Sequence, residues 1–239
     1  MPLPDPPPLT ERHALFLDFD GTLAPLRDEA GAVRLSALQH AVLERLAARR
    51  DGALALLSGR DVRDLAKRSP AGLHRIGNHG LYTLRPGESE PSGIDPLPAF
   101  AQRALQDAAK RFDGAFLEVK GPVGTVHFRA CPEAAPVLID AVQTVAARTP
   151  GYVAKVGNGV AEAIPEGADK GTALEWALAD EPFRGRIPVM VGDDTTDEDG
   201  FLAAQRLGGF GVKVGDGNTV ARKRLRDVDA VWTWLEAGS

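Results

Sequence analysis

The stretch Ala14-Leu15-Phe16-Leu17-Asp18-Phe19-Asp20-Gly21-Thr22 decides the fold, because a run of apolar residues gives way at once to paired carboxylates and a glycine. Such a run predicts a buried parallel strand that delivers polar groups at its carboxyl end. Ligands bind at that end in open α/β sheets. Taken alone, Asp-Gly-Thr could also be a simple turn, with Asp20 as an Asx-type turn former and Gly21 at positive φ. Two later runs that end in the same way favour the first interpretation.

These two further apolar runs also end in polar residues. Ala53–Leu57 precedes Ser58-Gly59-Arg60, and Ile187–Val191 precedes Gly192-Asp193-Asp194. Alternation of such strands with helical patterns predicts parallel pairing and right-handed crossovers. Parallel strands share a carboxyl edge, so these polar side chains should converge although they are far apart in the sequence. We therefore expect an α/β fold with a Rossmann-like parallel-sheet core and helices on both faces.

The pattern changes in the middle of the chain. Helices are predicted over Phe100–Phe112 and Glu133–Arg148, and a β-hairpin follows each helix. This order predicts an antiparallel sheet backed by two helices, an α+β cap inserted into the α/β core. We therefore expect a catalytic core made of residues 1–92 and 165–239, and an inserted cap made of residues 93–164.

Apolar residues at helical spacing predict which side chains of each helix face a core. Among them we expect Leu38 in the helix over Leu35–Arg50, Phe100 in the first inserted helix, and Val137 in the second.

Composition limits the class of protein. With 239 residues, of which 44% are hydrophobic, the chain can bury a full core. Its net charge of -5 has no basic block behind it, so we expect no nucleic-acid partner. Its apolar runs are far shorter than the roughly 20 residues that span a bilayer, so we expect no membrane partner. The single cysteine, Cys131, excludes an internal disulfide and, together with a proline-rich start unlike a signal peptide, favours a cytoplasmic location.

Oxygen ligands gather at the predicted carboxyl edge. Asp18, Asp20, Asp193 and Asp194 would repel one another there unless a cation lay among them. A set without His or Cys favours a hard ion, and Mg²⁺ typically uses few carboxylates together with water and substrate phosphate. Lys170 begins a predicted helix, where the helix dipole opposes its charge, and this indicates an anionic partner. The sequence therefore predicts a Mg²⁺ site next to a lysine that binds a carboxylate or a phosphate.

Some of these features have alternative explanations. Ser58 could be the N-cap of the helix that follows it. The acidic run Asp193–Asp199 could bind calcium, although it lacks the regular ligand alternation and the closing Glu of a calcium loop. Asp194 and Asp197 could each orient other groups or cap a helix, and the sequence does not separate these roles.

As a set, four motifs resemble those of phosphatases of the haloacid dehalogenase superfamily: Asp18-x-Asp20-x-Thr22, Ser58, Lys170 and Gly192-Asp193-Asp194. The resemblance implies that Asp18 is a nucleophile that attacks phosphorus and forms an aspartyl-phosphate. It implies that Asp20 protonates the leaving oxygen and later deprotonates the hydrolytic water. Ser58 and Lys170 would hold phosphate oxygens. Mg²⁺ would lie on Asp18, the backbone carbonyl of Asp20, and Asp193, and we count Asp194 with these expected metal ligands.

Charged residues share one face of the predicted antiparallel sheet. Period-two geometry puts Glu118 and Lys120 on one face of their strand, and His127 and Arg129 on one face of the next. This pattern is typical of a solvated sheet face. A cap over an active site predicts the same pattern, with Glu and His binding hydroxyls and Lys or Arg meeting phosphate.

A narrower resemblance, to the trehalose-6-phosphate phosphatase family, covers almost the whole chain. It is carried by Gly77-x-His79-Gly80, Glu118-x-Lys120, His127-x-Arg129, Glu162, Pro165 with Asp169-Lys170-Gly171, and Gly192-Asp193-Asp194-x-Thr196-Asp197-Glu198. It implies hydrolysis of trehalose 6-phosphate in trehalose biosynthesis, with Glu118, Lys120 and Glu162 contacting the disaccharide phosphate. The chain departs from the family pattern at Asn158 and Ile164, where basic residues are usual.

The substrate-binding residues that we expect are Thr22, Arg60, His79, Glu118, Lys120, His127, Arg129 and Glu162. Two alternative functions stay open. One is a phosphatase of another sugar phosphate, of the sucrose or mannosylglycerate type. The other is a catalytically silent module that regulates a sugar-nucleotide synthase. For an active enzyme, the resemblance suggests a functional link to a trehalose-6-phosphate synthase.

Overall fold

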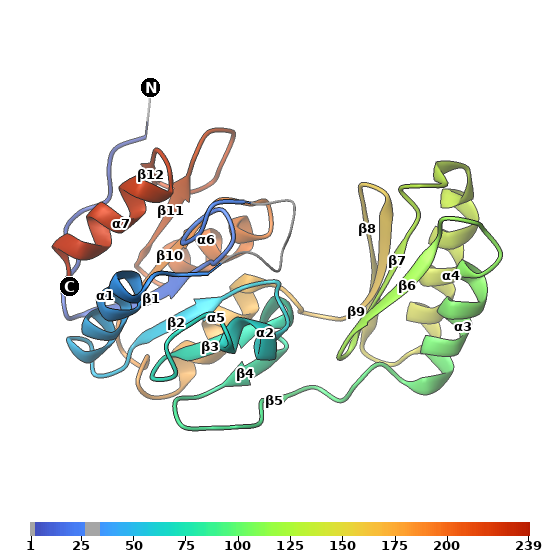
Figure 1. Ribbon diagram of the computed structural model, residues 1–239, viewed down its shortest axis with the longest axis horizontal. Coiled ribbons are helices and arrows are strands. Elements are labelled where there is room, and N and C mark those ends of the chain that lie inside the picture. The colour runs from blue at the N-terminus through green and yellow to red at the C-terminus, as the bar shows by residue number, and fades with distance from the viewer. Residues whose placement is uncertain (1–2, 27–33) are drawn as a thin grey trace. The chain divides into compact units, whose positions relative to one another are not determined.

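The computed structural model describes residues 3–26 and 34–239 and forms two compact units (Figure 1). The core unit is made of residues 1–92 and 169–239, and the inserted unit of residues 93–168. The second boundary falls after residue 164 because strand β9 (Val160–Pro165) of the inserted unit runs on through Pro165. Among the described residues, no helix has the length and apolar character needed to cross a membrane.

The sheet of the core unit is built around β1 (His13–Leu17). Its strand order is β12-β11-β10-β1-β2-β3-β4-β5. β1 pairs in parallel with β10 (Ile187–Gly192) on one side and with β2 (Leu54–Leu57) on the other. After β1 the chain continues to β2 on one side, and it later returns to the other side of β1 as β10. This makes the junction of β1 and β10 a topological switch point, where such sheets bind ligands.

The sheet continues with further strands beyond β10 on one side and beyond β2 on the other. The remaining strands are β3 (His74–Gly77), β4 (Tyr82–Leu84), β5 (Ser92–Gly93), β11 (Phe210–Val214) and β12 (Lys223–Leu225). β4 runs antiparallel to β3, whereas β11 and β12 continue the parallel pairing.

Helices cover both faces of the core sheet (Figure 1). They are α1 (Ala37–Ala48), α2 (Val62–Ala66), α5 (Lys170–Ala179), α6 (Asp197–Arg206) and α7 (Val228–Ala237). Alternate side chains of β1 enter different clusters: Leu15 and Leu17 pack with α1 and α7, and Phe16 packs with α5 and α6. A strand buried on both faces needs apolar residues on both, which explains the continuous apolar run from Ala14 to Leu17.

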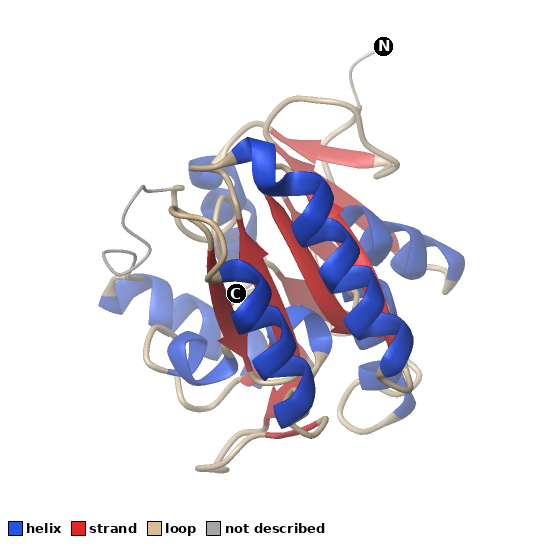
Figure 2. Ribbon diagram, turned by 90° about the vertical axis from the view of Figure 1, so that its right-hand side faces the viewer, coloured by secondary structure: helices blue, strands red, loops and turns tan. Residues whose placement is uncertain are grey.

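The inserted unit is an antiparallel sheet of strand order β6-β7-β9-β8. Its other strands are β6 (Phe116–Lys120), β7 (Val123–His127) and β8 (Tyr152–Gly157). Helices α3 (Ala99–Ala109) and α4 (Ala135–Arg148) cover one face of this sheet (Figure 2). The predicted fold class, an α/β core with an inserted antiparallel sheet backed by two helices, is therefore confirmed.

Three side chains that were expected in a core are exposed instead: Leu38, Phe100 and Val137. In α3 the buried stripe is Ala101, Leu105 and Ala109, so Phe100 lies one residue, or about 100° around the helix, away from it. Val137 precedes buried Leu138 in the same way, and Leu38 lies in the first turn of α1, before its buried residues begin. An error of one residue in the expected stripe is enough to turn a side chain toward solvent.

Candidate active site

A buried lysine joins the ends of two elements at the switch point of the core sheet. Lys170 Nζ lies 2.7 Å from Asp18 Oδ1 and 2.5 Å from Asp197 Oδ1, and all three side chains are buried. Lys170 is the first residue of α5, and Asp169 caps that helix through the Thr172 N–H. The anionic partner that the helix start predicted for Lys170 is therefore a pair of carboxylates.

Asp197 is the second carboxylate that binds Lys170. Its Oδ1 accepts from Lys170, and its Oδ2 accepts from the backbone N–H of Asp194 at 2.8 Å. The carboxyl group packs against Gly192, where an added Cβ would overlap it. Asp197 therefore fixes both the lysine and the loop after β10. The sequence left this role open, because Asp197 is one acid in a run of them.

Asp18 forms an acidic triad with two other aspartates. One carboxylate oxygen from each of Asp18, Asp193 and Asp197 lies within 4.8 Å of the other two. The hydroxyl of Thr22 donates to Asp193 Oδ1 at 3.2 Å. Gly21, at φ +78°, leaves room for the Asp193 carboxyl group, which an added Cβ would overlap. The turn after β1 thus shapes a cradle for Asp193, and Thr22 contacts this acid.

The charge balance of the triad fits a bound cation. Burial, together with the Asp197 and Asp193 carboxylates, raises the pKa of Asp18 to about 7 against the opposing effect of Lys170. Burial and the Asp197 charge also raise the pKa of Asp193. A divalent cation would relieve this repulsion and favour the ionised acids. The donor set is oxygen only, which suits a hard ion.

Lys213 is a contact that the sequence analysis missed. It lies on β11, is buried, and its Nζ donates to the backbone carbonyl of Asp193. A lysine between Val212 and Val214 in a buried strand was the available signal. Asp194, by contrast, is exposed, and its carboxylate accepts from the Thr195 hydroxyl at 2.8 Å. Asp194 lies outside the acidic triad.

Asp20 and Arg60 form a two-point ion pair beside the triad. Arg60 Nε lies 2.5 Å from Asp20 Oδ2, and Arg60 Nη2 lies 2.6 Å from Asp20 Oδ1. Ser58 is buried, and its Oγ accepts from the Arg60 N–H at 3.2 Å. The N-cap of α2 is Asp61, not Ser58, so the capping explanation of Ser58 is wrong.

His79 is held in a strained turn next to this loop. Asn78 and His79 both have positive φ, +53° and +58°, which is uncommon for residues with a side chain and clusters at functional sites. The imidazole lies against Gly59, where an added Cβ would be 2.7 Å from its Cε1. His79 is therefore fixed beside Ser58, and its contact with a substrate stays a prediction.

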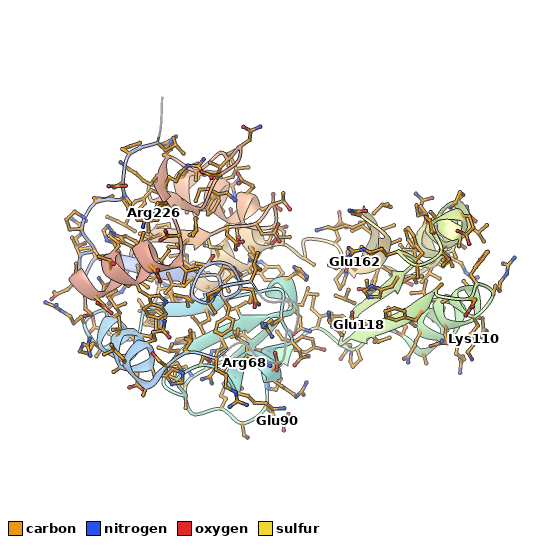
Figure 3. The ribbon with its side chains drawn as sticks, turned by 45° about the horizontal axis from the view of Figure 1, so that its top comes forward. Arg68, Glu90, Lys110, Glu118, Glu162 and Arg226 are labelled. Carbon is orange, nitrogen blue, oxygen red and sulfur yellow. The ribbon has the colours of Figure 1, made fainter. Side chains whose placement is uncertain are left out.

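Polar side chains lie on the face of the inserted sheet that α3 and α4 leave uncovered. Glu118 contacts Lys120 Nζ and His127 Nε2, each at 3.0 Å, and Thr125 donates to Glu162 at 2.8 Å. Partial burial opposes ionisation of Glu118, but the hydrogen bonds from Lys120 and His127 hold its pKa below the usual value. Figure 3 shows Glu118 and Glu162 on the strand side of the unit, whereas Lys110 lies on the helix side.

Arg129 is exposed and lies beyond the last residue of β7. β7 ends at His127, and the Arg129 guanidinium donates to the backbone carbonyl of Asn158 at 3.3 Å. Its contact with a substrate stays a prediction. The residue contacts the turn between β8 and β9.

Solved structures share this architecture. The C-terminal domain of the Candida albicans trehalose-6-phosphate phosphatase aligns with a TM-score of 0.74 and 21% identity over 96% of this chain and 93% of that chain. The C-terminal domain of the Candida albicans trehalose synthase regulatory protein aligns with a TM-score of 0.68 and 13% identity over 99% of both chains. At these identities the likeness shows the fold alone, and a haloacid dehalogenase-like hydrolase from Bacteroides thetaiotaomicron shares it with a TM-score of 0.64 and 19% identity over 93% of this chain and 97% of that chain.

The family follows from sequence similarity. The family model for trehalose-phosphatase matches residues 16–228. The trehalose-6-phosphate phosphatase of Escherichia coli (strain K12) is 37% identical over 240 residues, which is 98% of this chain and 90% of that protein. The chain belongs to the trehalose-phosphatase family, and it is a phosphatase. Both resemblances drawn from the motifs are confirmed.

Proposed function

We propose that this protein hydrolyses trehalose 6-phosphate to trehalose and phosphate, with Mg²⁺ as its metal. The observation that carries the reaction is the buried Asp18 carboxylate at the sheet switch point, 2.7 Å from Lys170 and within the acidic triad. The family and the substrate in the name of the Escherichia coli relative support the choice of sugar. A functional link to a trehalose-6-phosphate synthase stays a prediction.

The core unit supplies the groups for phosphoryl transfer. Asp18 would attack phosphorus, and the Lys170 ammonium would neutralise charge on the phosphoryl oxygens, with Ser58 as a further contact. Asp20 would donate a proton to the leaving oxygen and accept one from water in the second step. Asp18 and Asp193, with the Asp20 carbonyl, would hold Mg²⁺, which supplies positive charge where anionic groups meet.

The inserted unit supplies the proposed sugar contacts. Glu118 and Glu162 present carboxylates on the uncovered sheet face, where each is oriented by a neighbouring donor. Carboxylates oriented in this way can accept hydrogen bonds from sugar hydroxyls. Lys120 on the same face could meet a phosphate oxygen. We propose that residues 93–168 act as the cap that selects the substrate.

A substrate panel tests the reaction and the substrate together. We expect phosphate release to be at least about tenfold more efficient, as kcat/KM, for trehalose 6-phosphate than for sucrose 6-phosphate, glucose 6-phosphate or 4-nitrophenyl phosphate. Removing metal with a chelator should abolish the activity, and adding Mg²⁺ should restore it. Metal-dependent preference for another sugar phosphate would keep the reaction and reject this substrate. Phosphate release from none of the four compounds would reject the reaction.

Truncating Glu162 should weaken sugar recognition. We expect Glu162→Ala to lower kcat/KM for trehalose 6-phosphate by about 10- to 100-fold, because a charge-assisted hydrogen bond to a hydroxyl is lost. The aryl substrate, which has no sugar hydroxyls, should change less than about threefold. Glu133→Ala, at an exposed position just before α4, is the matched control. An equal loss on both substrates would give Glu162 a structural role instead.

A further inference from the structure

Four charged side chains form a ladder that leads away from Asp20. Arg60 binds Asp20 through Nε and Nη2, and its Nη1 lies 2.9 Å from Asp64 Oδ2. Arg68 binds the same Asp64 at two points, with Nε and Nη2 each 2.9 Å from a carboxylate oxygen. Arg68 lies in the core unit (Figure 3). The ladder alternates in sign, and Asp64 shares its charge between two guanidinium groups.

Arg60 is anchored at its backbone as well as at its side chain. Its N–H donates to Ser58 Oγ at 3.2 Å, and its carbonyl accepts from the Asn78 N–H at 2.7 Å. The guanidinium also lies over the Phe19 ring, 5.5 Å from the centroid. The Arg60 backbone therefore stays in place while its guanidinium can divide its donors between Asp20 and Asp64.

The proposed reaction requires Asp20 to loosen its hold on Arg60. Both carboxylate oxygens of Asp20 accept from the guanidinium. A proton on Asp20 removes the negative charge that binds the guanidinium and takes one of the acceptor sites of the carboxyl group, so this two-point ion pair weakens when Asp20 carries a proton. An arginine that releases one acid inside a site with 12% side-chain exposure needs another acid to hold it.

We propose that Asp64 and Arg68 are positioning residues that let Arg60 release Asp20 during the reaction. This inference rests on the proposed function. Asp64 gives Arg60 a second carboxylate to bind. Arg68 binds the same carboxylate, and this keeps Asp64 from replacing Asp20 as the main partner of Arg60. The hydrogen bonds from Arg68, together with those from Arg60 and against the effect of burial, hold the pKa of Asp64 below its usual value. Asp64 therefore stays charged throughout the cycle.

The proton balance shows where the release acts. In the first step the Asp18 oxygen bonds to phosphorus, the bond from phosphorus to the sugar oxygen breaks, and the Asp20 proton moves to that oxygen. In the second step water attacks the phosphorus of the aspartyl-phosphate, the bond from phosphorus to the Asp18 oxygen breaks, and the water proton moves to the Asp20 carboxylate. A nitrophenolate leaves without a proton, so an aryl ester needs Asp20 less in the first step than a sugar ester does.

Asp64→Asn tests the proposal because it keeps the shape of the side chain and removes its charge. The negative charge that competes with Asp20 for Arg60 is then removed. We expect kcat/KM, which reports the step that expels the leaving group, to fall about tenfold for trehalose 6-phosphate and to stay within about twofold for 4-nitrophenyl phosphate. Arg68→Gln should raise the ratio of the sugar kcat/KM to the aryl kcat/KM, because Asp64 can then bind Arg60 more strongly. This second variant also decides the matter if Asp64→Asn does not fold.

Asp180→Asn is the matched control, since Asp180 pairs with Arg184 at the same four-residue spacing at the other end of α5. It should leave the ratio of the two kcat/KM values unchanged. An equal fall on both substrates, or no change, in Asp64→Asn would overturn the inference, as would a lower sugar-to-aryl ratio in Arg68→Gln. If the unmodified protein fails to hydrolyse trehalose 6-phosphate, the proposed function itself fails.

Discussion

Asp18→Asn should lower kcat for trehalose 6-phosphate by at least about 10⁴-fold, because an amide cannot serve as the nucleophile. The fold should survive. Lys170 contacts two carboxylates, so after the change it still has a charged partner in Asp197. One of three crowded acids also disappears, which removes the repulsion of Asp18 by Asp197 and Asp193. Phosphate release and the melting temperature are the two measurements.

The control for this variant is the same chemical change at Asp194. Asp194 is exposed and lies outside the triad, so Asp194→Asn should reduce kcat by only a few fold. A loss comparable to that of Asp18→Asn would return Asp194 to the set of metal ligands. Near-normal turnover in purified Asp18→Asn would instead contradict the nucleophilic mechanism, whatever the control shows.

The convergence at the carboxyl edge could be predicted because it follows from strand topology. Apolar runs before Asp18, Ser58 and Asp193 predicted parallel strands, and parallel strands place their ends at one edge. Lys170 Nζ lies 2.7 Å from Asp18 although 152 residues separate them. Their proximity could be predicted from two facts alone: Asp18 follows the end of a strand, and Lys170 begins a helix.

The roles of single acids could not be predicted in the same way. Asp194 and Asp197 belong to one acidic run, but only Asp197 lies at the start of α6 and packs on Gly192. That difference depends on the path of the loop, which a run of similar residues does not encode. The pairing of Arg60 with Asp20 could not be predicted either, because several acids lie near the end of that strand. The sequence therefore placed Arg60 near the site without identifying its partner.

Lys170→Met should combine a loss of activity with a loss of stability. Burial alone would lower the pKa of Lys170, but Asp18 and Asp197 raise it, so the lysine is charged in the folded protein. Its removal leaves two buried carboxylates without their shared cation, which typically costs about 3–5 kcal/mol. For a chain of this size, we expect the melting temperature to fall by about 6–20 °C. We expect kcat to fall at least about 10²-fold, because the phosphoryl oxygens lose a positive partner.

Magnesium separates this electrostatic cause from a simple packing defect. If the destabilisation comes from unpaired carboxylates, saturating Mg²⁺ should raise the melting temperature of Lys170→Met more than that of the original protein, because the ion restores positive charge to the triad. Lys213→Met is the control: Lys213 is also buried, but its Nζ donates to a neutral backbone carbonyl. Its loss should cost only about 1–3 kcal/mol. Equal falls in melting temperature for the two variants, with equal responses to Mg²⁺, would show that burial of the lysine stem, not its pairing with Asp18 and Asp197, stabilises this edge.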